Sequence, residues 1–507
     1  MSAHLDAEPV LVVGAGIMGA GIAQIAAQAG HQVYLHDQRP GASSQARDKL
    51  VATLEGLVDK GKLQASDATA AMKRIVAIEA LQDASSAELV VEAIVEDLDA
   101  KRALFRELEA LLPDTAVFCT NTSSISVTAI GKDLQRPERL VGMHFFNPVP
   151  LMKLVEVVHG LLTAAIVANR IEALARSWGK VPVHTRSTPG FIVNRIARPF
   201  YAEALAMLQE QAGEPAQIDA CLRAAGFRMG PCELMDLIGH DTNFSVTRSV
   251  YDANFQDKRY VPSLLQAELV AGGLLGRKSG RGFYTYPQGV PALSADEHAE
   301  LIRPTSITVH GEGPLVELLQ ERLTCAAVTS TRIERQSNWI GLEIGSGRLV
   351  FTDGRTAQAL ASEQKDVAVV DWPLATLMLG ATPKHQHLAY ALAPQASAHW
   401  AQQAPAWLAA LGWTPVRLED TPGLAVARTV SMIVNEAADA VLQGVCTPEA
   451  ADAAMKLGVN YPAGPFEWLK VLGIRLVLAV LGKLNEDYRG ERYRSSPWLR
   501  RHLEQGI

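Results

Sequence analysis

Two residues that could act together in proton transfer stand twelve positions apart in the first third of the chain. His144 follows the apolar run LVGM, and Glu156 lies inside the otherwise apolar stretch LMKLVEVV. A carboxylate in an apolar strand is costly unless it is paired or hydrogen-bonded. A carboxylate that holds an imidazole fixes its tautomer and stabilises the imidazolium that forms when the histidine accepts a proton. The pattern therefore indicates a histidine base with an acidic partner, although it also fits a structural histidine beside an unrelated edge-strand glutamate.

A glycine-rich turn near the N-terminus has the spacing of a dinucleotide-binding loop. An apolar run leads into Gly14-x-Gly16-x-x-Gly19, and a helix of small residues follows. Gly14 permits a tight turn, Gly16 lets the backbone approach a pyrophosphate, and Gly19 lets the helix pack closely on the strand. The free N–H groups at the start of that helix suit phosphate oxygens.

An acid at the end of the next expected strand, HQVYLHD, completes this pattern. Asp37 lies 18 residues after Gly19, where a carboxylate can accept hydrogen bonds from the ribose hydroxyls. Its charge would repel a 2′-phosphate, so the sequence favours NAD over NADP, with Arg39 as a weak opposing signal. A glycine-rich turn without a ligand would leave Asp37 unexplained.

Three later segments are each an apolar strand that stops in polar or proline-rich residues. They are ELVVEAIVED (88–97), AVFCTNTSSIS (116–126) and RLVGMHFFNPVP (139–150). In a doubly wound parallel sheet, ligands bind outside the carboxyl ends of the strands. By position alone, the candidate ligand-binding residues are Glu96, Asn121, Ser123, Ser124, His144 and Asn147.

Composition and cysteine usage limit the class of protein. The 507 residues are 20% charged and 48% hydrophobic, as in globular proteins, and 54 acids against 47 bases give a net charge of −7. We therefore expect no nucleic-acid or membrane partner, and no apolar run approaches the roughly 20 residues that span a bilayer. The five scattered cysteines form no CxxC pair, and MSAHLDAEPV lacks a signal-peptide pattern. These features predict a cytoplasmic protein without a metal site.

Five segments in order resemble the L-3-hydroxyacyl-CoA dehydrogenases of β-oxidation and related bacterial pathways. They are NTSSI (121–125), HFFNPVPLMKLVEVV (144–158), STPGFIVNR (187–195), MGPCELMDLIG (229–239) and GRKSGRGFY (276–284). With the glycine turn, the resemblance covers about residues 8–290. It implies NAD-dependent oxidation of a (3S)-3-hydroxyacyl-CoA thioester to the 3-oxoacyl-CoA.

The resemblance also implies roles for individual residues. His144 matches the catalytic base and Glu156 its orienting partner, while Ser123 and Asn194 match the polar residues that hold the 3-oxygen and thioester region of the substrate. In such a reaction the base removes the hydroxyl proton as hydride leaves the same carbon, and Ser and Asn can donate to an oxygen whose charge changes.

Further residues match positions that contact the cofactor or coenzyme A. Glu96 and Lys101 match residues near the cofactor. The pattern of residues 50–75 predicts two amphipathic helices joined at 59–63. In the family that the chain resembles, a helical hairpin at this place lies against coenzyme A. Lys60 and Lys62 at that turn could meet its phosphates, or could simply form a solvated turn.

The helical part of the chain is duplicated. GKVPVHTRSTPGFIVNR (179–195) aligns with GWTPVRLEDTPGLAVAR (412–428) at a constant offset of 233 residues. Asn194 corresponds to Ala427, so the second copy lacks the polar group. We expect residues 421–507 to pack on residues 188–290 as an internal pseudo-dimer, with a homodimer also possible.

The region between the two helical copies resembles a shrunken nucleotide-binding domain. Gly311 and Gly313 remain in its first loop, but Val316 replaces the third glycine and Glu312 would repel a pyrophosphate. We interpret it as a Rossmann-like domain that has lost its ligand; the alternative is an unrelated α/β linker domain.

The expected fold is thus an α/β Rossmann domain plus an all-α C-terminal domain like that of 6-phosphogluconate dehydrogenase, repeated in degenerate form. The expected segments are a NAD-binding domain with a helical hairpin (8–187), a helical C-terminal domain (188–290), a degenerate Rossmann-like domain (305–418) and a second helical domain (419–507).

The acyl group of the substrate is not marked by any motif. The long duplicated form resembles bacterial enzymes of phenylacetate catabolism that act on 3-hydroxyadipyl-CoA, with 3-hydroxybutyryl-CoA or longer chains as alternatives. A non-catalytic NAD-binding or structural relative, or a sugar-acid dehydrogenase on the same scaffold, is the competing class. The intact His144, Glu156, Ser123 and Asn194 oppose the former, and the NTSS and KGK segments favour a CoA ester over a sugar acid.

Overall fold

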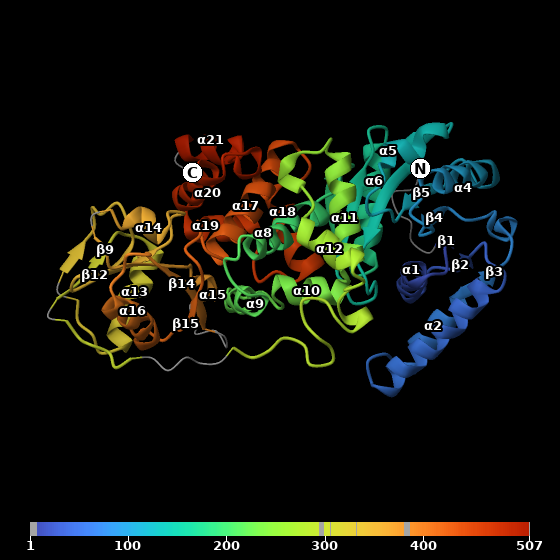
Figure 1. Ribbon diagram of the computed structural model, residues 1–507. Coiled ribbons are helices and arrows are strands. Elements are labelled where there is room, and N and C mark those ends of the chain that lie inside the picture. Colours follow the sequence, from blue (N-terminus) through green and yellow to red (C-terminus); the bar gives the residue numbers. More distant parts are fainter. Residues whose placement is uncertain are drawn as a thin grey trace. The chain divides into compact units, whose positions relative to one another are not determined.

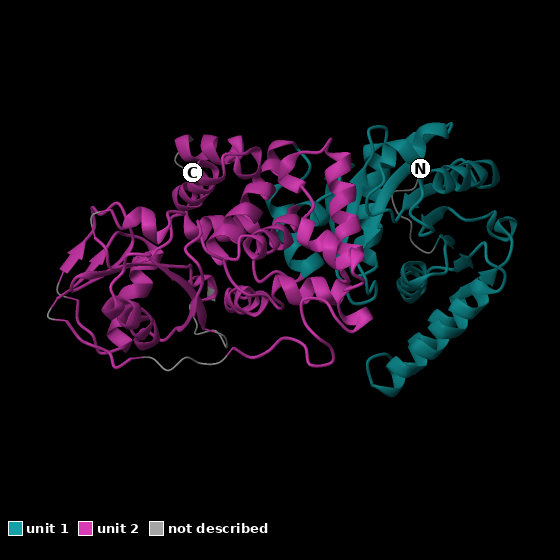
Figure 2. Cartoon of the chain, viewed as in Figure 1, with its two compact units in different colours: residues 1–195, 444–459 teal, residues 196–443, 460–507 magenta. Residues whose placement is uncertain are grey.

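The chain forms two compact units, which are coloured separately in Figure 2. Unit 1 comprises residues 1–195 and 444–459, and unit 2 comprises residues 196–443 and 460–507. The computed structural model describes residues 8–293, 299–304, 306–330, 332–362, 364–379 and 386–505. Residue 305, the expected start of the third segment, lies outside these ranges.

Unit 1 is built on an eight-stranded sheet in the order β3-β2-β1-β4-β5-β6-β7-β8. All neighbouring strands are parallel except β6 and β7, which are antiparallel. This order confirms the predicted Rossmann arrangement and places the carboxyl ends of β1, β4 and β5 along one edge. The strands are β1 (Val10–Val13), β2 (Val33–His36), β3 (Ile75–Ile78), β4 (Leu89–Glu92), β5 (Val117–Thr120), β6 (Leu140–Phe145), β7 (Leu154–His159) and β8 (Val181–Arg186).

Helices connect and cover these strands (Figure 1). The predicted hairpin is confirmed as α2 and α3, and Lys60 and Lys62 are exposed in the turn between them. The helices of this unit are α1 (Ile17–Gln28), α2 (Ala42–Asp59), α3 (Ala65–Arg74), α4 (Leu98–Leu111), α5 (Val127–Ile130), α6 (Ala165–Ser177) and α18 (Pro448–Val459), with α7 (Val193–Ile196) at its boundary.

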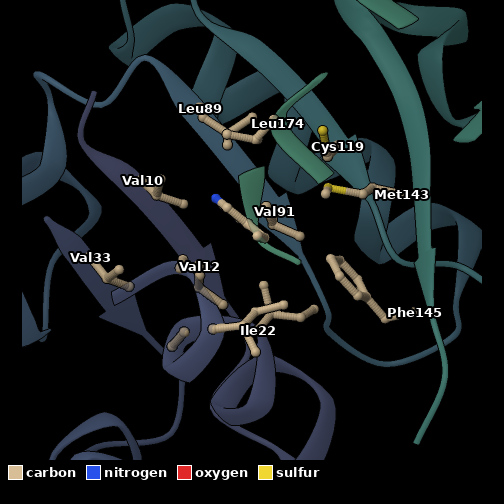
Figure 3. Close-up of a cluster of buried hydrophobic side chains, with 14 of the residues drawn as sticks. Val10, Val12, Ile22, Val33, Leu89, Val91, Cys119, Met143, Phe145 and Leu174 are labelled. Atoms are coloured by element: carbon tan, nitrogen blue, oxygen red, sulfur yellow. The ribbon is translucent and has the colours of Figure 1, made fainter. Parts of the chain in front are cut away.

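The strands of unit 1 are buried on both faces, which explains their continuous apolar runs. Successive side chains of a strand point to opposite faces, so Val10 and Val12 join one core cluster while Leu11 and Val13 join the other. Figure 3 shows the first cluster, in which Ile22 of α1 lies near Val12 of β1. The two cores fix the sheet edge where the glycine turn and the polar strand ends meet.

Unit 2 contains a second sheet, in the order β10-β9-β11-β12-β13-β14-β15. The antiparallel strand β11 is inserted beside β9, and β13 and β14 repeat the antiparallel step of β6 and β7. The predicted degenerate Rossmann-like domain is therefore confirmed. Its strands are β9 (Ile307–His310), β10 (Arg332–Glu334), β11 (Gly341–Ile344), β12 (Gly347–Phe351), β13 (Val367–Val370), β14 (His387–Leu392) and β15 (Thr414–Arg417), and its helices are α13 (Pro314–Cys325), α14 (Ala357–Leu360), α15 (Leu374–Leu379) and α16 (Ala398–Ala410).

The remaining helices of unit 2 come from both helical copies. Helix α8 of the first copy packs on α17 of the second, and α17 also packs on α19, α20 and α21. Among the described residues, no helix is both long and apolar enough to cross a bilayer. The helices are α8 (Arg198–Gln209), α9 (Pro215–Ala224), α10 (Pro231–Ile238), α11 (His240–Ala253), α12 (Leu264–Ala271), α17 (Val426–Leu442), α19 (Pro465–Leu472), α20 (Ile474–Tyr488) and α21 (Pro497–Gln505).

Candidate active site

The antiparallel pairing of β6 and β7 sets His144 directly opposite Glu156. The imidazole Nδ1 of His144 lies 2.6 Å from Oε2 of Glu156, and both side chains are buried. An ionised carboxylate can only accept a hydrogen bond, so Nδ1 carries the proton and donates it. The neutral imidazole then presents the lone pair of Nε2, which is the atom that can accept a proton from a bound molecule.

The second carboxylate oxygen of Glu156 is held by the backbone. The N–H groups of Ile192 and Val193 each donate to Oε1 at 3.0 Å. These amides lie at the start of α7, where N–H groups have no intrahelical acceptor. Glu156 therefore joins a buried strand, the histidine and the first turn of a helix in one hydrogen-bonded group, which fixes the direction of the imidazole.

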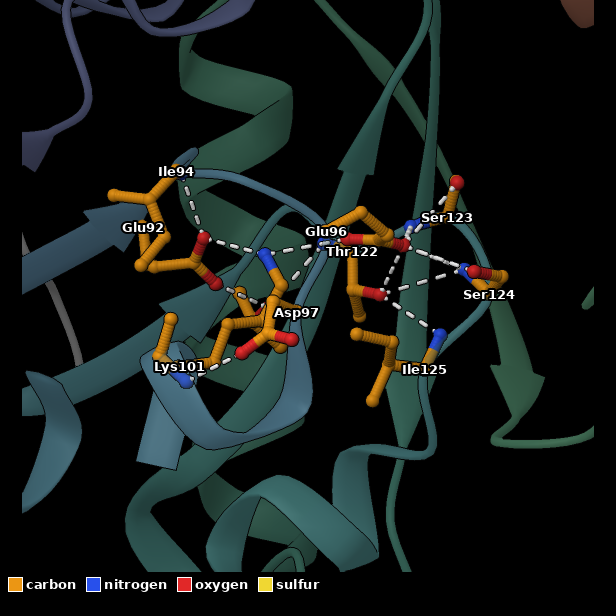
Figure 4. A network of polar contacts seen from close by, with 11 residues as sticks. Glu92, Ile94, Glu96, Asp97, Lys101, Thr122, Ser123, Ser124 and Ile125 are labelled. Carbon is orange, nitrogen blue, oxygen red and sulfur yellow. Dashed lines mark hydrogen bonds and ion pairs between the residues drawn. The ribbon is translucent and has the colours of Figure 1, made fainter. Parts of the chain in front are cut away.

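A second carboxylate organises the loop after β5, as Figure 4 shows. Oε1 of Glu96 accepts hydrogen bonds from the side chain of Thr122 and from the backbone and side chains of Ser123 and Ser124. Burial raises the pKa of Glu96, but the nearby Lys101 ammonium and these donors outweigh it, and the net pKa is lowered. Glu96 is therefore ionised at neutral pH and draws the NTSS loop together.

Lys101 links Glu96 to a second acid. Its ammonium lies 3.3 Å from Oε2 of Glu96 and 2.6 Å from Oε1 of Glu92, and both Lys101 and Glu92 are fully buried. Glu92 also accepts hydrogen bonds from the N–H of Ile94 and the hydroxyl of Thr120. Sequence reasoning did not select Glu92, although an acid at the end of the apolar strand LVVE was the available signal.

The glycine turn has the shape that a dinucleotide needs. A Cβ at Gly14 would lie 2.4 Å from the carbonyl oxygen of Ala93, and one at Gly19 would lie 1.7 Å from that of Gly14. A Cβ at Gly16 would meet nothing within 4 Å, because this residue lines an open cleft of about 590 Å³. The close packing and the open approach are the features that bring a pyrophosphate against backbone N–H groups, so these residues fit NAD.

Asp37 lines the same cleft at the end of β2. Its carboxylate accepts a hydrogen bond from the N–H of Ala15 at 2.9 Å and two from the guanidinium of Arg39. The bonds from Arg39 and from the backbone hold the pKa of Asp37 at about 2, against the effect of partial burial. Arg39 is exposed and pairs with the acid, so in this state it does not form a separate phosphate site.

The remaining candidate residues lie at the ends of these elements. Ser123 lies in the loop that Glu96 holds, and Asn194 follows Val193, whose N–H binds Glu156. Asn121, at the end of β5, accepts a hydrogen bond from the N–H of Phe145 and so connects this loop to the strand of His144.

Family models match most of the chain, with residues 287–348 outside the matched ranges. The model of the 3-hydroxyacyl-CoA dehydrogenase NAD binding domain matches residues 9–188, and that of the C-terminal domain matches residues 190–286 and 423–507. The model of the 3-hydroxybutyryl-CoA dehydrogenase reduced Rossmann-fold domain matches residues 349–422. The chain belongs to the 3-hydroxyacyl-CoA dehydrogenase family and is an NAD-dependent oxidoreductase.

Individual relatives agree with this assignment. The 3-hydroxyadipyl-CoA dehydrogenase of Escherichia coli is 42% identical over 99% of this chain and 99% of its own length. A probable 3-hydroxybutyryl-CoA dehydrogenase of Bacillus subtilis is 39% identical over 56% of this chain and 99% of its own. A crystal structure of 3-hydroxybutyryl-CoA dehydrogenase from Escherichia coli superposes with a TM-score of 0.88 at 42% identity, covering 99% of this chain and all of that one.

Proposed function

We propose that the chain oxidises (3S)-3-hydroxyacyl-CoA thioesters to 3-oxoacyl-CoA, with His144 as the catalytic base and Glu156 as its partner. The observation that carries this proposal is the 2.6 Å hydrogen bond between two buried side chains on antiparallel strands. Glu156 stabilises the positive charge that the imidazole gains, and the backbone amides that bind its other oxygen prevent it from turning away.

The reaction requires a proton and a hydride to leave the alcohol. The hydroxyl proton moves to Nε2 of His144, the carbon–oxygen bond becomes a carbonyl, and the hydride leaves the same carbon. NAD, when bound, supplies the acceptor for that hydride. Ser123 and Asn194 hold the 3-oxygen and the thioester region by hydrogen bonds, which orients the carbon for transfer.

Residues of the sheet edge would hold the cofactor. The loop Gly14–Gly19 binds the pyrophosphate. Asp37 accepts hydrogen bonds from the ribose hydroxyls once the Arg39 guanidinium has moved away from its carboxylate. Glu96 and Lys101 lie near the cofactor and keep the NTSS loop in position. The exposed Lys60 and Lys62 would meet the phosphates of coenzyme A.

The acyl substrate is 3-hydroxyadipyl-CoA, with 3-hydroxybutyryl-CoA as the second candidate. The Escherichia coli relative that aligns along the whole chain is a 3-hydroxyadipyl-CoA dehydrogenase, whereas the superposed crystal structure is of a 3-hydroxybutyryl-CoA dehydrogenase. A panel of 3-hydroxyacyl-CoA thioesters, including one with a terminal carboxylate, tests the proposal by following nicotinamide absorbance. We expect the dicarboxylic thioester to give the highest kcat/KM; no turnover with any thioester would overturn the reaction itself and favour a non-catalytic relative.

We further propose that the two helical copies form an internal pseudo-dimer. Arg259 of the first copy pairs with Glu436 of the second at 3.3 Å, and Arg492 of the second pairs with Glu203 of the first at 2.9 Å. The two arginines are 233 positions apart, and so are the two glutamates. The same pair therefore occurs twice with the copies exchanged, as at a two-fold interface.

Deletion of residues 300–507 tests this pairing. Loss of the second copy would uncover the apolar face of the first, so we expect aggregation or a homodimer in size-exclusion chromatography with light scattering. An active, well-behaved monomer would contradict the pseudo-dimer. A cytoplasmic location is also proposed, and it is supported by the five free thiols, as expected in a reducing compartment.

A further inference from the structure

Unit 1 contains sixteen residues from the second half of the chain, residues 444–459, drawn in the colour of unit 1 in Figure 2. Most of them form α18, which packs on β7 and β8. Strand β7 carries Glu156, so a segment of the degenerate half lies directly against the strand that presents the partner of His144. The sequence alone does not suggest this, because residue 444 is 288 positions after residue 156.

Two close contacts fix the segment on the sheet. At its start, the N–H of Arg186 donates to the carbonyl oxygen of Val445 at 3.0 Å. Near its end, the buried Gly458 meets two side chains so closely that a Cβ there would lie 2.7 Å from Cδ2 of Leu154 and 3.0 Å from Cγ2 of Val193. A side chain at position 458 would therefore push against both of these residues.

Leu154 and Val193 both lie close to Glu156, one along the strand and one through a hydrogen bond. Leu154 lies two positions before Glu156 on β7, and so on the same face of the strand. The N–H of Val193 donates to Oε1 of Glu156. In addition, burial raises the pKa of the Cys446 thiol to about 12, with Arg195 lowering it and Glu156 raising it, so the start of the segment also lies within electrostatic range of the carboxylate.

The same arrangement occurs on the second sheet, with the roles of the two helical copies exchanged. In unit 2, the N–H of Glu419 donates to the carbonyl oxygen of Ala212 at 2.8 Å, and α9 of the first copy packs on β14. Glu419 and Ala212 are each 233 positions from Arg186 and Val445. Each helical copy thus supplies a helix to the other copy's sheet, and among the residues that the structure describes the histidine–glutamate pair lies on the first sheet.

We infer that α18 of the degenerate half is a positioning element of the active site, and that Gly458 is its positioning residue. The helix supports Leu154 and Val193 and thereby keeps Glu156 within hydrogen-bond distance of His144. This inference rests on the proposed role of the His144–Glu156 pair. It explains why a half without its own base remains part of the enzyme: its structural contribution to the first half is still required.

Gly458→Ala and Gly458→Val test the inference in full-length protein. Displacing the dyad by a few tenths of an ångström disturbs the alignment of base and substrate, so we expect kcat to fall by about threefold for alanine and about thirtyfold for valine. The KM for NAD should change by less than about twofold, because the glycine turn is far from this contact in the sheet order. Steady-state kinetics give both quantities, and thermal unfolding gives the folded fraction.

Gly482→Ala is the matched control. Gly482 also lies within a helix of the second half, but a Cβ there meets nothing within 4 Å. It receives the same gain in helix propensity as Gly458→Ala, and its kcat should remain native. Leu154→Ala combined with Gly458→Val should recover at least part of kcat, since it removes the nearest atoms that the valine displaces.

The inference is overturned if folded Gly458→Val turns over at the native rate, or if its kcat falls without any recovery in the Leu154→Ala background. Should the valine variant not fold, the alanine variant gives the decision in the same way. These results are separate from a failure of the proposed function, which would show itself as native turnover in His144→Ala.

Discussion

The two sheets of this chain begin with the same turn. Gly14 and Gly311 both have positive φ, +105° and +92°; a Cβ at Gly14 would lie 2.4 Å from the carbonyl oxygen of Ala93, and one at Gly311 would lie 2.9 Å from Cγ1 of Ile340 and 3.0 Å from the carbonyl oxygen of Trp339. The N–H of Gly14 donates to the carbonyl oxygen of His36, and that of Gly311 donates to the carbonyl oxygen of Glu334. The backbone of a dinucleotide site is thus present twice.

The side chains that would contact a ligand differ in charge between the two turns. Ala15 of the first turn corresponds to Glu312 of the second, and Asp37, the residue after His36, corresponds to Arg335. The second sheet even has the larger cavity, about 1020 Å³ against about 590 Å³, and Glu312 lines it. The second turn thus differs from the first in charge, whereas space beside it remains open.

At the start of the helix that follows each sheet, backbone N–H groups donate hydrogen bonds to a buried carboxylate. Asp371 accepts hydrogen bonds from the N–H groups of Ala425, Val426 and Ala427, at 2.7 to 2.9 Å. The first two of these amides lie 233 positions after the two that bind Glu156. Holding the helix start is therefore common to both halves, whereas the histidine is present in one.

The largest difference between the halves should appear in turnover. His144→Ala should lower kcat by about a thousandfold or more while NAD still binds, because the base is lost and the glycine turn is untouched. Glu156→Gln should also give a large loss, whereas Asp371→Asn should leave the kcat of the folded enzyme within about twofold. Steady-state assays give kcat, and a fluorescence titration with the nicotinamide cofactor gives its binding. Near-native turnover of His144→Ala would contradict the assignment of catalysis to the first half.

The reciprocal ion pairs should have equal importance in the two copies. Glu203→Gln and Glu436→Gln each remove one buried carboxylate from an arginine cluster in which a second acid remains, Glu210 beside Arg428 and Asp439 beside Arg259, and we expect each to lower the free energy of unfolding by about 3 kcal/mol. Denaturant titration of the two variants checks this. A large loss of unfolding free energy in one variant and none in the other would mean that the two symmetry-related ion pairs do not contribute equally to stability.

Asp371 should make the free energy of unfolding depend on pH. Burial raises the pKa of Asp371 to about 6, so between pH 4 and 6 the folded chain holds a proton that the unfolded chain releases. Its contribution to stability therefore increases as pH falls through this range, by about 2–3 kcal/mol, and is constant above it.

Comparison of the native chain with Asp371→Asn isolates this effect. The native minus variant difference in unfolding free energy should grow in favour of the native chain from pH 7 to pH 4. Asp219, whose pKa burial also raises to about 6, titrates in both proteins and cancels. A difference that is independent of pH would contradict the expected titration.

The smallest effect concerns cofactor choice. NAD should be preferred over NADP by at least about tenfold in kcat/KM, roughly 1.4 kcal/mol, because Asp37 repels a 2′-phosphate. Asp37→Ala should narrow this ratio, since Arg39 would be released from its carboxylate. Arg335→Ala in the second half is the control and should leave the ratio unchanged. Equal use of both cofactors by the native chain would assign control of the site to Arg39.

Much of the architecture was predictable because it depends on sequence patterns within short segments. The order of strand, glycine turn and helix, the insertion at 50–75, and the repeat at an offset of 233 all follow from spacing within short segments. The pairing of His144 with Glu156 was predictable in part, because an acid within an apolar strand needs a partner and the histidine lies near the end of the strand before it.

Other features depend on contacts between segments that are far apart in the chain. The hydrogen bond from Thr120 to Glu92 joins two strand ends 28 positions apart, and the hydrogen bonds from the start of α17 to Asp371 join a strand end to a helix 54 to 56 positions further along the chain. No spacing rule relates such residues, because the distance between them is set by the packing of the sheet.

The sequence by itself thus determined the class of fold, the cofactor loop and the duplication, since these depend on backbone geometry and on periodic burial of apolar side chains. Only the tertiary structure decided that α18 of the second half lies on β7 and β8 of the first. The physical reason is that each sheet must cover its outer strands with an apolar helix, and two equivalent helices are available in one chain. On the first sheet the contact is close at Gly458, where a Cβ would lie 2.7 Å from Cδ2 of Leu154 and 3.0 Å from Cγ2 of Val193.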